Sequence, residues 1–290
     1  MTLLRSVALS VAALSALSFT GAARAQSLDG RLKRIVETRT IAIAYRGDAT
    51  PFSFTDDKNQ ITGFTIDLCK RVASSIAIQF NIQGLSIKWV PVTAQTRFDA
   101  VVKGQADMEC GSSTVSLSRL KEVDFSSYIF VESTGLLVKE ASGLRKLADM
   151  VGKKIAVIAG TTNDRAINNQ LLRRQINASV VAYPSRDEAL AALETGKADA
   201  FAWDKLLLVG AAAARKGSGQ LLLLPEDYSF EPYGIVLPRG DSAFRLAVNT
   251  GLSQIYRSSD ISEIFNLWFA PLGPPTPLLE TVYTFGAIPD

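Results

Sequence analysis

The sequence of 290 residues contains no histidine. Catalytic arrangements of the Ser-His-Asp and Cys-His kinds, and metal sites built on imidazole, are therefore excluded. Cysteine is scarce as well, because Cys69 and Cys110 are the only two, too few and too far apart for a zinc cluster. Nothing in the sequence indicates a metal site or a cofactor, and no residue is assigned a catalytic role.

The chain also lacks a large excess of charge of either sign. The chain has 31 Lys and Arg residues against 28 Asp and Glu residues, a net charge of +3, and no basic block. Nucleic acid is therefore not expected as a partner, because binding to its phosphates requires a basic patch. Hydrophobic residues make up 47% of the chain, enough to bury a core, and the length suits one large domain or two ordinary ones.

The N-terminus contains an apolar run without an acidic residue. Residues 1–25 hold an early arginine, the apolar stretch from Val7 to Phe19 and a final Ala-Arg-Ala triplet. This order is typical of a secretory signal peptide, so we expect cleavage after Ala25 and a periplasmic protein. A membrane anchor is the alternative, but the run is too short and too rich in Ser and Ala to span a bilayer well. Export allows Cys69 and Cys110 to form a disulfide, and two buried thiols are the alternative.

The rest of the chain alternates strand-like and helix-like segments, and the alternation occurs twice. Strands are expected at 40–45, 86–92, 106–110, 153–159, 179–183 and 198–202. Two further β-rich segments, 128–138 and 228–237, flank the second series, and the Pro-rich tail PLGPPTPL at 271–278 is expected to end the fold.

We predict from this repetition an α/β protein with two lobes, the second inserted into the first. Lobe 1 comprises residues 26–131 and 235–290, and lobe 2 comprises residues 132–234. Two crossover segments join the lobes, and a ligand would bind between them at the strand ends.

Three groups of polar residues follow predicted strands. The first is the run Gly111-Ser112-Ser113-Thr114 with Arg119 after it, a set of hydroxyls and a guanidinium able to hold a carboxylate. The second is Gly160-Thr161-Thr162, which can hold an anion, and the third is Asp204, which can hold an ammonium. Helix capping or a solvated side chain explains each group equally well when it is taken alone.

One enzyme-like pattern is also present. Ser118 to Lys121 fits the S-x-x-K motif of penicillin-binding enzymes. The companion S-D-N and K-T-G elements are missing, so we do not interpret this pattern as a nucleophile site.

Several ordered motifs between Leu32 and Pro271 together resemble the solute-binding proteins of polar amino-acid ABC transporters, family 3. They are P-F-S-F at 51–54, G-F-x-x-D-L-C at 63–69, S-x-T-x-x-x-x-R at 112–119 and L-E-x-G-x-A-x-A-F-x-x-D at 193–204. The resemblance implies a two-lobed, hinged, periplasmic-binding-protein-like fold of type II. It implies that Arg119 binds the ligand α-carboxylate and Asp204 the α-ammonium. Three hydroxyl residues would complete these contacts: Ser112, Thr114 and Thr162.

Within that family, the stretches 46–54, 93–97 and 109–114 are most similar to the glutamate/aspartate-binding members. By this resemblance, Arg46 and Arg97 receive the side-chain carboxylate of the ligand. Two positions depart from the pattern: Ala94 stands where those members carry Ser, and Arg186 stands where they carry His. The first departure removes a hydroxyl donor. The second keeps a positive charge, so an anionic group is still expected, and because arginine does not titrate near neutrality, we expect little change in affinity between pH 6 and 8.

The resemblance therefore implies a periplasmic receptor without catalysis that closes around an acidic amino acid and delivers it to an ABC permease in the inner membrane. We expect a monomer with hinges near 131–135 and 231–234. A periplasmic enzyme on the same fold, similar to cyclohexadienyl dehydratase, is the alternative and would need a general acid between the lobes. A sensory or scavenging receptor without a transporter is a third reading.

Overall fold

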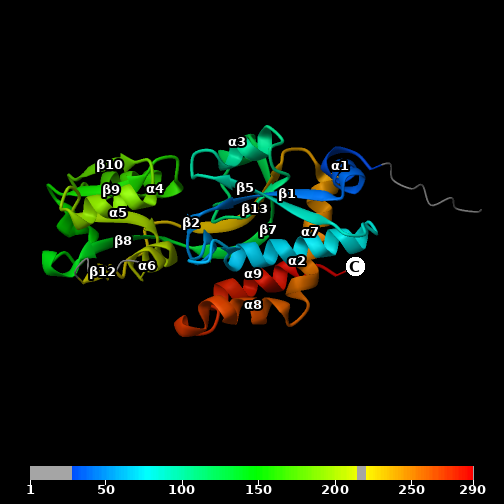
Figure 1. The fold of residues 1–290 in the computed structure, drawn as a ribbon. Helices are drawn as coiled ribbons and strands as arrows, with labels where there is room; N and C mark the ends of the chain where they lie inside the picture. The colour runs from blue at the N-terminus through cyan, green and yellow to red at the C-terminus, as the bar shows by residue number, and fades with distance from the viewer. Residues whose placement is uncertain (1–27, 214–219, 290) are drawn as a thin grey trace, which may run out of the picture.

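The computed structural model describes residues 28–213 and 220–289, so the predicted signal peptide at 1–25 lies outside the described residues. Two five-stranded sheets form the centres of two lobes, which lie side by side in Figure 1. In sheet order, the first sheet consists of β5 (Ser86–Val92), β1 (Thr40–Arg46), β6 (Met108–Glu109), β13 (Glu231–Pro238) and β7 (Val123–Glu132). The second consists of β10 (Ser179–Tyr183), β9 (Lys154–Ile158), β11 (Ala200–Asp204), β8 (Thr134–Lys139) and β12 (Leu221–Leu223). The predicted two-lobed α/β fold is confirmed. We call the lobe around the first sheet lobe 1 and the other lobe 2.

Lobe 1 has a mixed sheet surrounded by helices. Its strands are β1 (Thr40–Arg46), β5 (Ser86–Val92), β6 (Met108–Glu109), β7 (Val123–Glu132) and β13 (Glu231–Pro238), with a small separate sheet of β2 (Asp48–Ala49), β3 (Ser53–Thr55) and β4 (Ile61–Thr62). Its helices are α1 (Gly30–Thr38), α2 (Phe64–Gln79), α3 (Arg97–Val102), α7 (Ser242–Tyr256), α8 (Asp260–Phe269) and α9 (Pro277–Gly286). β1 runs parallel to β5 and β6, whereas β13 is antiparallel to β6 and β7.

Lobe 2 is smaller and repeats the strand–helix alternation. Its strands are β8 (Thr134–Lys139), β9 (Lys154–Ile158), β10 (Ser179–Tyr183), β11 (Ala200–Asp204) and β12 (Leu221–Leu223). Its α-helices are α4 (Thr162–Arg173), α5 (Arg186–Glu194) and α6 (Lys205–Ala213). Short 3-10 helices complete the described chain: η1 (Arg119–Lys121), η2 (Glu140–Ser142), η3 (Leu147–Met150) and η4 (Ala270–Leu272).

The β-rich segment expected at 128–138 is two strands. β7 ends at Glu132 in the first sheet, and β8 begins at Thr134 in the second, with Ser133 between them. A local pattern of apolar residues does not reveal such a break, because both halves have the same strand character. The second crossover leads from β12 to β13, which pairs with β7 from Glu231 onward. The lobe boundaries at 131/132 and 234/235 stay predictions.

The expectation that the Pro-rich tail ends the fold was wrong, because α9 begins at Pro277 within it and continues to Gly286. The Thr276 hydroxyl accepts a hydrogen bond from the Leu279 backbone N–H, and Pro277 occupies the first turn. Both features are favourable at a helix start, where backbone N–H groups lack partners within the helix. Leu279 and Tyr283 are buried, so α9 packs onto lobe 1.

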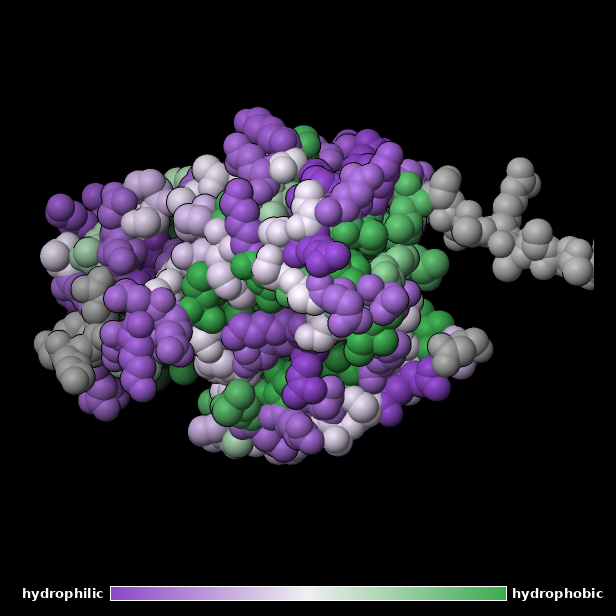
Figure 2. Space-filling view, turned by 45° about the vertical axis from the view of Figure 1, so that its right-hand side comes forward, coloured by the Kyte–Doolittle hydropathy of each residue, from purple (hydrophilic) through white to green (hydrophobic). Residues whose placement is uncertain are grey.

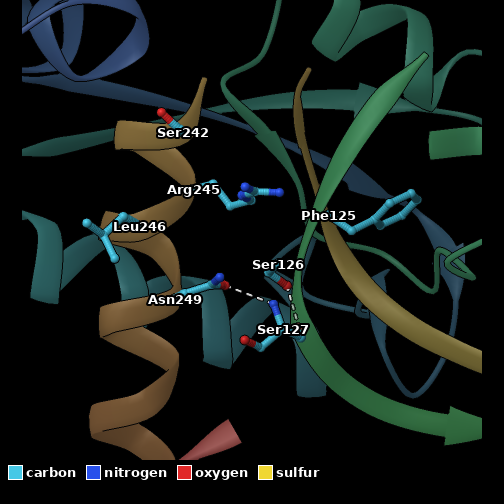
Figure 3. A pocket seen from close by; sticks show the side chains of 7 residues that line it. All are labelled: Phe125, Ser126, Ser127, Ser242, Arg245, Leu246 and Asn249. Atoms are coloured by element: carbon cyan, nitrogen blue, oxygen red, sulfur yellow. Dashed lines mark hydrogen bonds between the residues drawn. The ribbon is translucent and has the colours of Figure 1, made fainter. Parts of the chain in front are cut away.

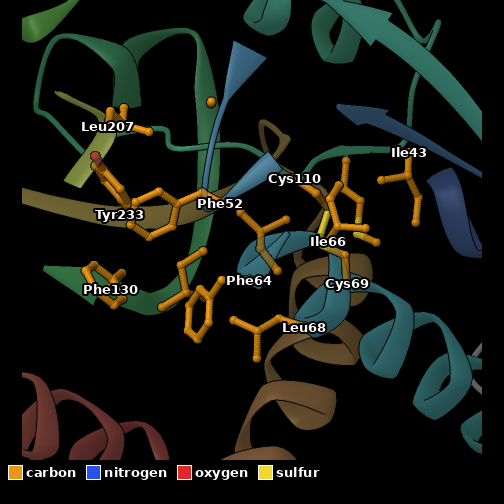
Figure 4. Close-up of a cluster of buried hydrophobic side chains, with 14 of the residues drawn as sticks. Ile43, Phe52, Phe64, Ile66, Leu68, Cys69, Cys110, Phe130, Leu207 and Tyr233 are labelled. Atoms are coloured by element: carbon orange, nitrogen blue, oxygen red, sulfur yellow. A yellow bond between two sulfur atoms is a disulfide. The ribbon is translucent and has the colours of Figure 1, made fainter. Parts of the chain in front are cut away.

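An aromatic cluster fills the middle of lobe 1 (Figure 4). The Phe52 ring lies 4.9 Å from that of Phe130 and 5.2 Å from that of Tyr233, centroid to centroid. Next to the cluster, a disulfide joins Cys69 on α2 to Cys110 after β6, which settles the choice between a disulfide and two thiols. The segment that precedes α2 is close-packed: a Cβ on Gly63 would lie 2.3 Å from the Phe52 carbonyl oxygen.

The surface differs between the lobes. In Figure 2, lobe 2, at the left, presents mainly hydrophilic residues, whereas hydrophobic residues gather on lobe 1. Several exposed apolar side chains of lobe 1 belong to its C-terminal helices: Leu267, Leu272, Leu278 and Phe285. Within residues 28–213 and 220–289, none of the helices combines the length and the apolar character needed to cross a membrane.

Candidate functional site

Six charged side chains are buried where the two lobes meet. None of them is more than 8% exposed: Arg46, Arg97, Glu109, Arg119, Asp204 and Glu231. A buried charge is costly unless it is paired or hydrogen-bonded, so such a concentration points to a functional site rather than to a packing core.

Thr114, Arg119 and Thr162, all predicted from the sequence, come together at the centre of this cluster. Arg119 donates hydrogen bonds to the carbonyl oxygens of Thr114, at 2.7 Å, and of Gly160 in lobe 2, at 3.5 Å. The Thr114 hydroxyl lies 3.3 Å from that of Thr162 on α4. Ser112, 9% exposed, lies in the same turn as Thr114. The structure thus brings the predicted hydroxyls and Arg119 to one place.

The turn that carries these hydroxyls is held by β13. Thr114 forms an isolated β-bridge with Tyr233, and the Val115 N–H donates to the Pro232 carbonyl oxygen at 2.7 Å. The Gly234 N–H donates to the Ser113 carbonyl oxygen at 3.1 Å. This pairing fixes Thr114 against the strand that also carries Glu231.

Asp204 and Glu231 form what we call the acidic pole. Asp204 ends β11, and its carboxylate accepts hydrogen bonds from the Asn163 amide, at 2.6 Å, and from the Tyr233 hydroxyl. Glu231 accepts from the Thr114 and Thr162 hydroxyls, at 2.6 and 2.5 Å, and from Ser229 at 2.6 Å. Burial, reinforced by the Glu231 charge, raises the pKa of Asp204 to about 7, although hydrogen bonds from Tyr233 and Asn163 oppose this shift.

Arg46 and Arg97 form what we call the arginine pole. The Arg97 guanidinium donates to the Ala94 carbonyl oxygen, but its Nε has no hydrogen-bond partner in the described part of the chain. Burial, and then the positive charges of Arg119 and Arg46, lower the pKa of Arg97 to about 9. The guanidinium carbons of Arg97 and Arg119 lie 4.5 and 4.9 Å from the ring centroid of Phe98, so this ring contacts both cations.

Glu109 lies close to the arginine pole, but within the described residues its carboxylate makes no direct hydrogen bond to the arginines there. Its Oε2 accepts a hydrogen bond from the Ser113 hydroxyl at 2.8 Å, whereas Oε1 has no partner among the described residues. Burial raises the pKa of Glu109, although the charges of Arg97 and Arg46 oppose the shift.

Arg46 and Arg186 meet at Asp48. The Arg46 guanidinium donates two hydrogen bonds to the Asp48 carboxylate, at 2.8 and 2.9 Å. Arg186, at the start of α5 in lobe 2, reaches across to lobe 1 and donates to the Asp48 carbonyl oxygen at 2.8 Å. Arg186 also pairs with Asp187 at 2.9 Å. Both arginines thus lie at the cluster, but each has a protein partner.

The sequence reasoning did not assign a role to four groups of this site. They are Asp48, Asn163, Glu231 and Tyr233. A signal was available for Glu231, because an acidic residue that begins a strongly apolar strand is unusual unless it is paired. No local signal distinguishes Asp48, since acidic residues are common in turns.

A pocket of about 520 Å³ lies elsewhere in lobe 1, between α7 and β7 (Figure 3). Its lining includes Ser126, Arg245 and Asn249, and the side-chain amide oxygen of Asn249 accepts a hydrogen bond from the Ser127 backbone N–H at 2.8 Å. The Arg245 side chain is 46% exposed. This pocket has no buried pair of opposite charges, so the cluster between the lobes is the stronger candidate site.

Comparisons with known proteins show which proteins this chain is similar to. The profile of the bacterial extracellular solute-binding proteins, family 3, matches residues 41–271. An L-glutamate/L-aspartate-binding protein of Pseudomonas aeruginosa is 33% identical over 252 residues, which cover 87% of this chain and 83% of that protein. A glutamate/aspartate import solute-binding protein of Escherichia coli is 28% identical over 244 residues, 84% of this chain and 81% of that protein.

A solved structure is similar as well. It is an ancestral amino-acid-binding protein described as a precursor of cyclohexadienyl dehydratase, and the sequences are 27% identical. The match covers 83% of this chain and 100% of the other, with a TM-score of 0.71. The fold of this chain is therefore shared with a protein described as amino-acid-binding and as the precursor of an enzyme.

Proposed function

Because the chain belongs to the bacterial extracellular solute-binding proteins, family 3, we propose that it is the binding component of an amino-acid ABC importer and holds glutamate or aspartate between its lobes. The observation that carries the proposal is the arginine pole. Two buried guanidinium groups lie near a third, Arg119, and an Nε of Arg97 lacks a partner among the described residues. An anionic ligand would supply the missing negative charge.

The proposed ligand contacts follow the two poles. Arg119 binds the α-carboxylate, with Ser112, Thr114 and Thr162 beside it. Asp204, one of the two buried carboxylates of the acidic pole, binds the α-ammonium. Arg46 and Arg97 face the side-chain carboxylate, and Arg186 adds a positive charge from lobe 2. An amino acid with two carboxylates and one ammonium complements this distribution of charge.

Binding works by closure of the lobes in this proposal. Hydrogen bonds already cross between the lobes from Arg186 to Asp48 and from Arg119 to Gly160. We assign the hinges to the two crossovers, where Gly135 pairs with Trp203 and where the register of β13 against β7 shifts at Gly234. Closure about such segments is typical of two-lobed binding proteins.

We further propose that the protein is exported, with a signal peptide cleaved after Ala25, and works as a periplasmic monomer. Its partner is a permease in the inner membrane. No catalytic step is proposed, because the buried carboxylates of the acidic pole are engaged by protein hydrogen-bond donors and suit the binding of an ammonium.

A thermal-shift screen of the mature chain against the twenty amino acids tests the ligand class. L-glutamate or L-aspartate should give the largest rise in unfolding temperature. At 100 times its dissociation constant a ligand adds about 2.7 kcal/mol to the free energy of unfolding. A response confined to basic or apolar amino acids would overturn the proposal.

A further inference from the structure

We propose that Asp48 sets the charge preference at the side-chain end of the site. By neutralising Arg46 from within the protein, it weakens the preference for a ligand carboxylate over the carboxamide of the same shape. This inference rests on the proposed function, because it concerns how the same site ranks its ligands.

Asp48 is held in place from both lobes. Its carboxylate receives two hydrogen bonds from Arg46, at 2.8 and 2.9 Å, in the geometry that arginine and carboxylate favour. Its backbone carbonyl oxygen accepts from Arg186 of lobe 2 at 2.8 Å. The residue pairs with Phe54 across the β2–β3 hairpin. Asp48 is therefore part of the built site, although its side chain remains 32% exposed.

The backbone around Arg46 is fixed as well. The Ser53 hydroxyl accepts a hydrogen bond from the Arg46 N–H at 3.0 Å and donates to the Arg46 carbonyl oxygen at 3.1 Å. The position of the Arg46 side chain relative to Asp48 thus follows from the hairpin rather than from a flexible loop.

The carboxylates near the pole are distributed unevenly among the arginines. Arg46 pairs with Asp48, and Arg186 pairs with Asp187. Arg97 feels the nearby negative charge of Glu109, but within the described residues it forms no direct ion pair like these two, and the hydrogen bond of Glu109 goes to Ser113. Of these three arginines, Arg97 is therefore the one that a ligand meets without a direct ion pair among the described residues.

The electrostatic consequence concerns the second charge of the ligand. A ligand carboxylate at this end would lie beside the anionic Asp48 and compete with it for Arg46, whereas a carboxamide adds no negative charge. Burial works against ionisation of Asp48, but the charge and hydrogen bonds of Arg46, together with Arg186, lower its pKa, so the competing group is negative at neutral pH. Removing that charge frees Arg46 for the ligand.

The test compares L-glutamate with L-glutamine, which differ in charge but hardly in shape. Dissociation constants are measured by calorimetry for the parent chain and for Asp48→Asn, which keeps the side-chain size and one acceptor oxygen. The preference for glutamate over glutamine should increase by about tenfold, equivalent to about 1.4 kcal/mol. A preference that stays within a factor of two, or that falls, would overturn the inference. Where glutamine gives no measurable heat, the glutamate dissociation constant is read alone against the same limits.

Asp57→Asn is the matched control, because Asp57 is an exposed acid of the β3–β4 connection outside the cluster, and its preference should equal that of the parent. Asp48→Ser is measured if Asp48→Asn fails to fold, with the same expected direction. A parent chain that binds neither glutamate, aspartate nor their amides would reject the proposed function itself, and this inference with it. Binding by the parent with an unchanged preference in the variant would reject the inference alone.

Discussion

The two poles of the buried cluster differ in how completely the protein satisfies its own charges. At the acidic pole, both oxygens of Asp204 and both of Glu231 accept hydrogen bonds from protein side chains. At the arginine pole, Arg97 Nε and Glu109 Oε1 have no partner in the described chain. The hydrogen bonding of the acidic pole is therefore complete without a ligand, whereas that of the arginine pole is not.

This difference indicates which end of the ligand contributes most to the ligand-dependent stability of the protein. The carboxylates of the acidic pole are already oriented, so an ammonium can bind there with little rearrangement. The arginine pole carries like charges in a buried place, and Asp48 pairs directly with Arg46 alone, so an arriving anion relieves repulsion that the protein leaves. Binding of the anionic groups should therefore be the larger source of ligand-dependent stability.

Replacing Arg119 should have the largest effect on binding. Arg119→Ala leaves the α-carboxylate of the ligand unpaired in a buried site, which typically costs about 2–5 kcal/mol of binding free energy. Calorimetry with L-glutamate measures this loss, and Arg245→Ala in the separate pocket of Figure 3 serves as the control. An Arg119→Ala affinity within about threefold of the parent, less than 1 kcal/mol, would contradict the role given to this residue.

The outline of the cluster could be predicted from the sequence, because polar groups after parallel strands gather at one edge of a sheet. Thr114, Arg119 and Thr162 were found in this way, and the structure brings them together. The partners of these residues could not be found in this way. The contact of Thr162 with Glu231 joins residues 69 positions apart, and no local pattern records which strand ends face each other across two lobes.

The fold shows the same limit. The burial of Leu68, Val72 and Ile76 along α2 follows from their four-residue spacing, so that helix was predictable. The division of one β-rich segment at Ser133 and the helix α9, which begins at Pro277, were not predictable, because both depend on packing against distant parts of the chain. Likewise, the role of an acidic turn residue such as Asp48 could not be predicted, because it depends on its contacts with Arg46 and Arg186.

Replacing a charge at each pole with an apolar side chain would test the comparison directly. Arg97→Met should weaken glutamate binding by about 1.5–3 kcal/mol, the scale of hydrogen bonds to a charged group. It should change the free energy of unfolding of the unliganded protein much less than Asp204→Leu does, because Asp204→Leu leaves the Asn163 and Tyr233 donors without an acceptor. Urea denaturation without ligand measures both values. A larger loss in Arg97→Met would mean that the arginine pole is already satisfied.

The pH dependence of binding should come from the acidic pole. Arg186 alone predicts little change between pH 6 and 8, but burial and the Glu231 charge raise the pKa of Asp204 to about 7, which changes this expectation. Ionised Asp204 binds the ligand ammonium, so affinity for glutamate should rise by about tenfold from pH 6 to pH 8. Calorimetry at the two pH values measures it, and Asp204→Asn should lose the dependence. Equal affinities of the parent at both pH values would be inconsistent with this role.

Asp204 should have the opposite pH dependence in its effect on the stability of the unliganded protein. Because the pKa of Asp204 is higher in the folded chain than its ordinary value of 3.8, the folded state binds the proton more tightly than the unfolded state does. Stability from this group is therefore present below about pH 4 and is lost as the pH rises towards 7. Glu132, whose pKa burial and then Asp204 raise to about 8, contributes with the same sign. Unfolding temperatures without ligand should show this fall, and Asp204→Asn should reduce it.

The smallest expected effect belongs to a contact outside both poles. Gln95, exposed on lobe 1, donates hydrogen bonds from its amide to the carbonyl oxygens of Ala159, at 2.9 Å, and Pro184, at 3.0 Å, both in lobe 2. Gln95→Ala should destabilise the closed form by about 1 kcal/mol, the typical contribution of a neutral hydrogen bond. The loss should be the same for glutamate and aspartate and should appear mainly as faster dissociation, measured by stopped-flow fluorescence against Gln83→Ala as control. An equal loss of affinity for the two ligands would mean that closure acts on both poles together. A loss of affinity that differs between glutamate and aspartate would show that Gln95 belongs to the arginine pole and not to the contact between the lobes.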